Sequence, residues 1–329
     1  MIVLRILLFL VIFAGMLLFF VMRNQEKGQK PVWQTGSFLR VGDVQMDYRE
    51  GLVYLDAAKN NYDKYYGEAI WDYVIDSEGN TIASRVKEEV LEQIIYIKVV
   101  CRQASELGIV LSAEELQEVD NQTDEFMEKI AGSSLIEEGI NADIVRRIYS
   151  DNMLARKTFE AYALNVDTDI SDEEARQRHF YSVAVRNFTL DAAGNPVYYT
   201  GEDKAALETR MQQLLTKATE QTDFYTWAKS VTEDEKTLEL TGGEGDFSEE
   251  YENVLMNLRT GEMSGVVETK DYYYIFYCKS DFDIDATLAE KERLIYRRQT
   301  EEFWKLYDVW RANCMVEVNQ DVWGSMKIE

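Results

Sequence analysis

Histidine is almost absent from this chain of 329 residues, which contains a single one, His179. Every catalytic mechanism that needs two histidines is therefore excluded, and a Ser-His-Asp hydrolase site would have one candidate in a poor context. The residues before it, Glu174-Ala-Arg-Gln-Arg, are typical of the exposed end of a helix. We expect His179 to be a solvated surface side chain rather than a catalytic base.

Cysteine is also scarce. Cys101, Cys278 and Cys314 are an odd set, lie in apolar or helical stretches and lack C-x-x-C spacing. This pattern favours buried thiols over a disulfide framework or a zinc site. Whether two of them oxidise depends on distances that the sequence does not contain.

Basic residues are few, 35 against 60 acidic ones, which gives a formal net charge of −25. Such a charge repels phosphate backbones and suits a soluble secreted protein, so we expect no nucleic-acid partner. The glycine run at residues 241–246 (TGGEGD) has no lysine after it and lies among acidic residues. We therefore interpret it as a structural turn and not as a phosphate-binding loop.

One acidic cluster has the spacing of a calcium loop. Asp281, Asp283, Asp285 and Glu292 occupy the positions of its carboxylate ligands. Ala286 replaces the required glycine, and a helix N-cap at Asp285 explains the cluster more simply. We predict no metal site and no cofactor.

The chain has one long apolar run, residues 6–22 (ILLFLVIFAGMLLFFVM), bounded by Arg5 and Arg23. It reaches the short end of the ~17–25 residues that span a bilayer, is longer than a signal-peptide core, and has no A-x-A cleavage site after it. We predict a membrane-spanning signal-anchor at residues 1–23 and a linker at 24–38. A cleaved signal peptide is the alternative. The nearby charges by themselves favour the opposite topology.

Helical periodicity dominates the next segment. Val90, Ile94, Ile97 and Cys101 form an apolar stripe at helical spacing. Gly108 ends this helix, and residues 112–115 (SAEE) begin another with a capping box, as residues 171–174 (SDEE) do later. We predict a helical domain at residues 39–165.

A mixed segment follows. Residues 180–190 (FYSVAVRNFTL) alternate as a strand, with Val183, Val185, Asn187 and Thr189 on one face. Residues 194–196 predict a turn and residues 203–219 a helix. The pattern at residues 257–278 predicts a hairpin whose last strand places Tyr272, Tyr274, Phe276 and Cys278 on one face. The fold class is therefore α+β.

These segments resemble a known family. Residues 91–115 are similar to the motif L-x-x-L-I-x-x-x-L-x-x-x-A-x-x-L-G-I-x-V-S-x-x-E of extracytoplasmic foldases of the SurA and PrsA type. Residues 178–282 resemble the parvulin (PpiC-type) peptidyl-prolyl isomerases. The stretch LRTGEMSG followed by Val267 and Thr269 matches their L-x-x-G-E-x-S-x-P-V-x-T, and DFYTWA matches D-F-x-x-L-A.

The resemblance implies a site, and the sequence departs from it. Parvulins carry one histidine on the first strand and another on the last; here Asn187 and Tyr274 stand at these positions. Asp234 matches the family's acidic position, and Phe247 and Tyr251 match aromatic positions near the proline pocket. We expect Asn187, Asp234 and Tyr274 to mark the catalytic site, with Phe247, Tyr251 and Tyr274 binding substrate. Whether Tyr274 lines a peptide groove or fills the core stays open.

Near the C-terminus, the predicted helix at residues 287–312 and the segment around Trp323 look suited to fold back on the helical domain, as the resemblance implies. The helical domain would then include residues 287–323. The resemblance also implies a single-pass protein of the cell membrane, largely extracytoplasmic, that binds unfolded or extended client polypeptides. Because Asn187 and Tyr274 replace the family's histidines, we expect weak or no isomerase activity. The alternatives are an active prolyl isomerase with an atypical site and a scaffold subunit for one fixed partner.

Overall fold

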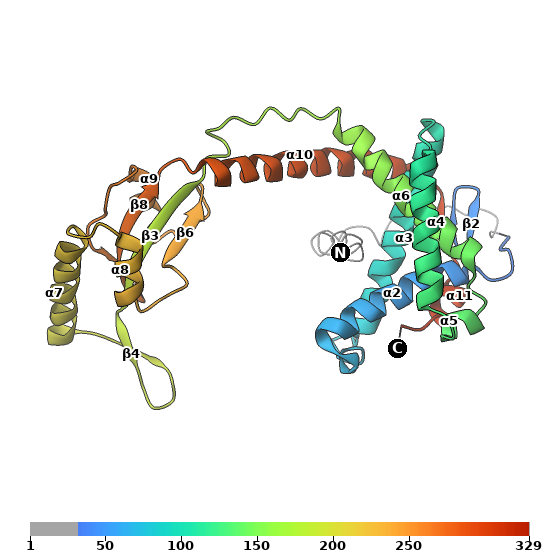
Figure 1. The fold of residues 1–329 in the computed structure, drawn as a ribbon. Coiled ribbons are helices and arrows are strands. Elements are labelled where there is room, and N and C mark those ends of the chain that lie inside the picture. The colour runs from blue at the N-terminus through green and yellow to red at the C-terminus, as the bar shows by residue number, and fades with distance from the viewer. Residues whose placement is uncertain (1–31, 329) are drawn as a thin grey trace. The chain divides into compact units, whose positions relative to one another are not determined.

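The computed structural model describes residues 32–328 and is a mixed α+β fold, as predicted (Figure 1). Its contacts divide the chain into two compact units. One comprises the described chain up to Val166 together with the chain from Glu301, and is mainly helical. The other is Asp167–Thr300 and is built on a β-sheet.

The predicted membrane-spanning segment lies outside the described residues. Within residues 32–328, no helix combines the length and the apolar character that crossing a membrane requires.

A four-stranded antiparallel sheet organises the unit Asp167–Thr300. Its strand order is β6 (Glu239–Gly242), β3 (Arg178–Arg186), β8 (Tyr272–Ser280) and β7 (Val267–Glu268). Because side chains alternate between the faces of a strand, the sheet has two apolar faces. One face packs on α7 (Gly201–Ala218) and α8 (Phe224–Val231), and the other on α9 (Glu252–Asn257).

The first strand of this unit is shorter than the sequence predicted. β3 ends at Arg186, and residues beyond Asn187 form β4 (Phe188–Leu190), which pairs with β5 (Pro196–Tyr198) in a separate hairpin. The hairpin turn is closed by Asp191, whose carboxylate accepts from the backbone N–H groups of Ala193 and Asn195. The predicted face that joined Val183 and Val185 to Thr189 is therefore wrong.

Three further local predictions are wrong. His179 is not at an exposed helix end but on β3, where it is 8% exposed and its Nε2 lies 2.8 Å from Glu239 Oε1. Asp283, not Asp285, caps α10 (Ile284–Ala312), because its Oδ1 accepts from the Ala286 N–H at 3.0 Å. Residues 171–174 form only a turn, although the Glu174 N–H does donate to Ser171 Oγ.

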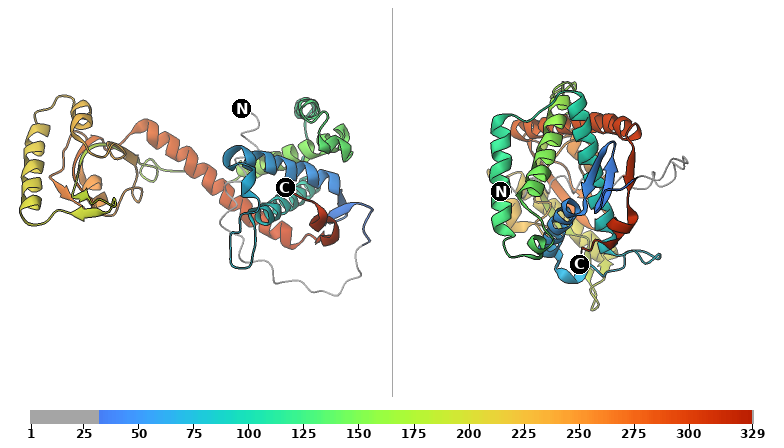
Figure 2. Two further views of the ribbon diagram at one scale, coloured as in Figure 1. Left: turned by 90° about the horizontal axis from the view of Figure 1, so that it is seen from below. Right: turned by 90° about the vertical axis from the view of Figure 1, so that its right-hand side faces the viewer.

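The unit that ends at Val166 and resumes at Glu301 is mainly helical, as predicted. Its helices are α2 (Tyr48–Tyr66), the short η2 (Glu68–Ile70), α3 (Ile82–Glu106), α4 (Ala113–Lys129), α5 (Ser134–Glu137), α6 (Ala142–Ala163), the last turns of α10, and α11 (Gln320–Ser325). The packing of α6 against both α3 and α4 forms its centre (Figure 2). The predicted stripe on α3 is confirmed, since Val90, Ile94 and Ile97 are at most 3% exposed. The capping box of Ser112 and Glu115 is also present.

The C-terminal segment packs on this helical unit. β9 (Val316–Val318) pairs with β1 (Ser37–Val41), which pairs in turn with β2 (Val44–Asp47). The Trp323 ring stacks on Phe38 at 5.1 Å, and the Phe303 and Tyr307 rings lie 6.4 and 5.1 Å from Tyr96. Residues separated by most of the sequence thus share one core.

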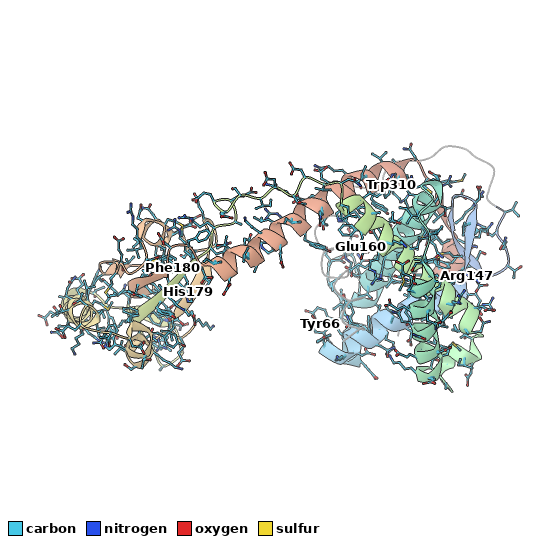
Figure 3. All side chains as sticks on the ribbon, turned by 45° about the horizontal axis from the view of Figure 1, so that its top comes forward. Tyr66, Arg147, Glu160, His179, Phe180 and Trp310 are labelled. Atoms are coloured by element: carbon cyan, nitrogen blue, oxygen red, sulfur yellow. The ribbon has the colours of Figure 1, made fainter. Side chains whose placement is uncertain are left out.

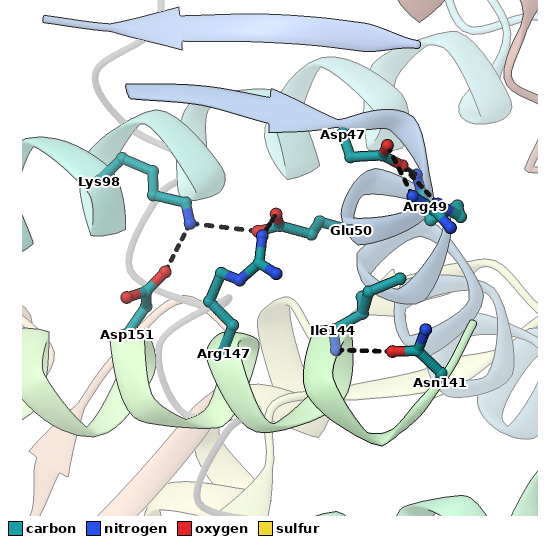
Figure 4. A network of polar contacts seen from close by, with 8 residues as sticks. All are labelled: Asp47, Arg49, Glu50, Lys98, Asn141, Ile144, Arg147 and Asp151. Atoms are coloured by element: carbon teal, nitrogen blue, oxygen red, sulfur yellow. Dashed lines mark hydrogen bonds and ion pairs between the residues drawn. The ribbon is translucent and has the colours of Figure 1, made fainter. Parts of the chain in front are cut away.

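A buried ionic network crosses the helical unit (Figure 4). Glu50, which is 1% exposed, accepts from Lys98 Nζ at 3.2 Å and from Arg147 at 3.0 Å. Lys98 also donates to Asp151. Burial alone would lower the pKa of Lys98, but the charges of Asp151 and Glu50 outweigh this effect and raise it. Glu50 lies on α2, Lys98 on α3 and Asp151 on α6, so the network joins three helices. Each buried charge is stabilised by an opposite charge from another helix.

We expect Lys98→Met to destabilise the helical unit by about 3–5 kcal/mol, because it leaves the buried Glu50 carboxylate without its nearest buried cation. The control is Arg146→Met, which removes an ion pair with Asp120 whose side chains are 47% and 44% exposed and should change the free energy of unfolding by less than about 1 kcal/mol. Denaturant unfolding followed by circular dichroism measures both. Equal effects of the two substitutions would contradict the proposed importance of the buried network.

Candidate functional site

The pairing of β3 with β8 determines which side chains meet in the sheet unit. Its register sets Ala184 opposite Tyr274, Ser182 opposite Phe276 and Phe180 opposite Cys278. These side chains share the face toward α9 with two residues of the preceding loop. We call this cluster the aromatic face and define it as Phe180, Ala184, Phe247, Tyr251, Tyr274, Phe276 and Cys278.

Aromatic rings pack closely within this cluster. The Tyr274 ring stacks on Phe276 with centroids 5.2 Å apart and planes 13° apart, and Tyr251 lies 5.3 Å from the first ring and 5.0 Å from the second. Tyr274 is only 5% exposed. Of the two roles left open by the sequence, the structure shows Tyr274 packed into the core.

A chain of polar contacts runs along one edge of the aromatic face. Ser182 Oγ donates to the Thr237 carbonyl at 2.6 Å, and Thr237 Oγ1 donates to Asp234 Oδ2 at 3.1 Å. The Tyr274 hydroxyl also interacts with Thr237. Asp234 and Tyr274, predicted from separate motifs, therefore lie at the same site, linked through Thr237.

The surroundings of Tyr274 keep its hydroxyl protonated. Burial raises the pKa of Tyr274 most, and the nearby Tyr251 and Asp234 raise it further, while the hydrogen bond with Thr237 works in the opposite direction. The net result is a pKa above the ordinary tyrosine value of 10.0. At neutral pH this side chain is a neutral phenol that forms hydrogen bonds, and it cannot accept a proton as an imidazole does.

The glycine run before Phe247 is a tight turn, as predicted. The Gly243 N–H donates to Asp246 Oδ2 at 2.8 Å. A Cβ atom on Gly242 would lie 3.0 Å from the ring of Phe247, so a larger residue would displace that ring. The absent side chain lets Phe247 approach Phe180, with ring centroids 5.7 Å apart.

The motif at residues 258–265 positions β8. Gly261 has a φ of +84°, a conformation that favours glycine, and it allows the turn closed by Glu262, whose carboxylate accepts from the Arg259 N–H. Ser264 then bonds to Phe276 twice: its N–H donates to the Phe276 carbonyl, and its Oγ accepts from the Phe276 N–H. These motif residues support the strand that carries Tyr274.

Asn187 does not join this site. It is the third residue after Ala184, the partner of Tyr274, and lies beyond the end of β3. Its N–H donates to the Asp271 carbonyl at 2.8 Å, and its Nδ2 donates to the Lys270 carbonyl at 3.3 Å. The prediction that Asn187 meets Tyr274 is wrong. Ala184 pairs with Tyr274, and Ser182 pairs with Phe276 on the same face.

Sequence reasoning missed Ser182, Ala184 and Thr237 as neighbours of the site. The alternation of β3 indicated which residues share a face, but not which of them stands opposite Tyr274. A shift of register changes every such pair. The long separation between the two strands leaves no local turn to set that register.

Residues 192–280 match the protein family described as "Rotamase: PPIC-type PPIASE domain". This module is a parvulin-type domain. The match covers Asp234, Phe247, Tyr251 and Tyr274 and begins after β3, so it does not include Asn187.

The resemblance to SurA/PrsA-type foldases is confirmed by relatives along the chain. The foldase protein PrsA of Caldanaerobacter subterraneus subsp. tengcongensis is 25% identical over 215 residues, which are 64% of this chain and 61% of that protein. PrsA of Clostridium botulinum is 23% identical over 75% of this chain and 76% of its own. The structure of PrsA from Streptococcus pneumoniae has 18% identity and a TM-score of 0.31, covering 76% of this chain and 96% of that one.

The aromatic face contains no imidazole. The single histidine, His179, lies on β3 between two carboxylates, Glu239 and Asp283, and takes no part in the aromatic face. Figure 3 labels His179 beside its neighbour Phe180, which does belong to that face.

We predict that the Tyr274 hydroxyl of the folded domain stays protonated to well above pH 10, because its pKa is raised. A folded-state pKa above the unfolded one means that the neutral phenol stabilises the fold fully below pH 10, and that this contribution is lost as the pH rises through the folded-state pKa. Ultraviolet absorbance is titrated with pH for the unchanged chain and for Tyr274→Phe. The difference between the two curves should show one tyrosine that ionises well above pH 10. Tyr66→Phe is the matched control, because the Tyr66 side chain is 67% exposed. A difference curve for Tyr274 with its midpoint near 10 would show an accessible hydroxyl.

Proposed function

We propose that this chain is a membrane-anchored extracytoplasmic folding factor that binds extended segments of unfolded proteins. Its parvulin-type domain has weak or no prolyl isomerase activity. The similarity to PrsA foldases supports the folding role. The apolar run at residues 6–22 supports the anchor, and the net charge of −25 suits a soluble domain outside the cell.

One observation carries the proposal about activity: the ring of Tyr274, at a family histidine position, is 5% exposed, stacks on Phe276 and contacts Tyr251. Rotation about an X–Pro bond has a barrier of about 18–20 kcal/mol. An enzyme lowers it by holding the twisted amide more tightly than the planar one. The aromatic face is filled by its own rings and therefore offers proline little contact. The neutral phenol of Tyr274 also takes the place of imidazole in the polar contacts with Thr237 and Asp234.

The alternative, an active isomerase with an atypical site, is favoured by the polar chain of Asp234, Thr237 and Tyr274. Rotation about the X–Pro bond requires no covalent chemistry, so hydrogen bonds from these hydroxyl groups would suffice. Movement of the Tyr251 and Phe247 rings would give proline access to them. Both proposals retain Asp234, Tyr274, Phe247 and Tyr251 as site residues.

Two assays on the same preparation separate the proposals. We expect the chain to suppress aggregation of a chemically unfolded protein while leaving the cis–trans rate of a proline tetrapeptide at its uncatalysed value. The variant Asp234→Ala should leave both results unchanged. Clear catalysis of the tetrapeptide that Asp234→Ala or Tyr274→Phe abolishes would establish the active isomerase instead. Failure to suppress aggregation would refute the folding role.

The strand register predicts where imidazole could be restored. Ala184→His with Tyr274→His places two imidazole rings on directly paired residues. Because histidine is smaller than tyrosine, the change at position 274 makes room for the ring at position 184. We expect this pair to raise the isomerisation rate on the order of tenfold, about 1.4 kcal/mol of barrier. The matched pair Asn187→His with Tyr274→His should give no increase, and circular dichroism checks that both variants fold. An increase in the second pair alone would contradict the register.

A further inference from the structure

An exposed apolar surface lies at the end of α2 and in the loop that follows it. Its members are Tyr65, Tyr66, Tyr73, Val74 and Ile75, which are 60%, 67%, 66%, 54% and 44% exposed. We call this surface the aromatic tip. Figure 3 labels Tyr66 at the end of α2. Five large exposed side chains within eleven residues are unusual in a chain that is otherwise strongly acidic.

The loop that carries the aromatic tip is tied to the helices by specific bonds. Trp71 is 4% exposed, and its Nε1 donates to Asp63 Oδ1 at 2.7 Å. The Ile82 N–H donates to the Tyr73 carbonyl at 3.0 Å, and a β-bridge joins Val74 to Thr81. The tip therefore presents its side chains on an ordered backbone, which lowers the entropic cost of binding.

The turn beyond the tip is also built from local bonds. Asp76 accepts from the backbone N–H groups of Glu78 and Asn80 and from the Asn80 side chain. These bonds, those from Asn80 most of all, hold the carboxylate of Asp76 and lower its pKa. Val74 and Ile75, which precede this turn, stay outside the helical core. The backbone N–H groups of Glu78 and Asn80 in the turn are bonded to Asp76.

Acidic residues outnumber basic ones along residues 60–80, the part of the chain that carries the aromatic tip. Glu68, Asp72 and Glu78 are exposed beside it, whereas Lys64 is the one exposed basic residue within residues 60–80, and its Nζ lies 5.6 Å from the Tyr65 ring centre. Aromatic rings and carboxylates together attract arginine and lysine side chains, whose alkyl stems also cover apolar surface. The same carboxylates repel phosphate headgroups, so an anionic membrane is disfavoured.

We propose that the aromatic tip is a docking site for extended polypeptide segments that carry basic side chains next to apolar ones. The inference rests on the proposed folding role and specifies the chemistry of the client. Apolar side chains contact Tyr66, Tyr73 and Val74, and the basic ones pair with Glu68 and Asp72.

A peptide titration with the full chain tests the docking site. The probes are two fluorescent twelve-residue peptides, one alternating arginine with leucine and the other glutamate with leucine. We expect the arginine peptide to bind at least about tenfold more tightly, a difference of about 1.4 kcal/mol. Its affinity should fall about tenfold in the triple variant Tyr65→Ser, Tyr66→Ser, Tyr73→Ser. Substitution of exposed residues leaves the core intact, and denaturant unfolding verifies this.

Two control variants separate the contributions. Leu107→Ser with Val110→Ser removes exposed apolar side chains elsewhere on the helical unit, 48% and 71% exposed, and should leave the affinity unchanged. Glu68→Gln with Asp72→Asn should abolish the preference for arginine over glutamate while retaining apolar binding. Equal affinities for the two peptides in the unchanged chain, or an unchanged affinity in the triple variant, would overturn the proposal.

The outcomes distinguish this inference from the folding role. If the triple variant binds the arginine peptide and suppresses aggregation as well as the unchanged chain, the tip is not the docking site and the folding role stands. If the unchanged chain fails to suppress aggregation, the folding role fails, and the peptide affinities still decide whether the tip binds. Sedimentation with phosphatidylserine vesicles that depends on the three tyrosines, without peptide binding, would assign the tip to a membrane and refute the proposal.

Discussion

The antiparallel pairing of β3 with β8 is the constraint on which the sheet unit depends. It brings Ala184 opposite Tyr274 and thereby decides which side chains form the aromatic face. The residues around it serve this pairing. Gly261 forms the turn that leads to β8, and Ser264 holds the backbone of Phe276 from both sides. Much of the family motif at residues 258–265 thus has a structural role that is independent of catalysis.

The buried phenol of Tyr274 determines how the aromatic face is packed. Tyr274 keeps hydrogen-bonding capacity through Thr237 but occupies the interior with its ring, beside Tyr251 and Phe276. Burial also keeps its hydroxyl protonated at neutral pH. The sheet needs apolar packing on both of its faces, and the ring of Tyr274 supplies part of this packing on the face toward α9.

Apolar packing and a buried ion pair together stabilise the helical unit. Its core joins α3 and α6 with the C-terminal residues Phe303 and Trp323, and the buried Lys98 donates a hydrogen bond to the buried Glu50. Aromatic side chains appear in two roles here. Some fill this core, and those of the aromatic tip stay exposed on a loop that Trp71 anchors. Structural packing accounts for the first group, and we propose that the second group binds client polypeptides.

The sequence by itself determined the α+β class, the helices with their caps at Ser112 and Gly108, and the alternation that sets Tyr274 and Phe276 on one face, because these follow from short-range periodicity. It also excluded a histidine pair by composition alone. Only the tertiary structure decided that β3 ends before Asn187, that Ala184 faces Tyr274, and that His179 lies between two carboxylates. Strand register and burial arise from contacts between residues far apart in the chain, which local pattern does not encode.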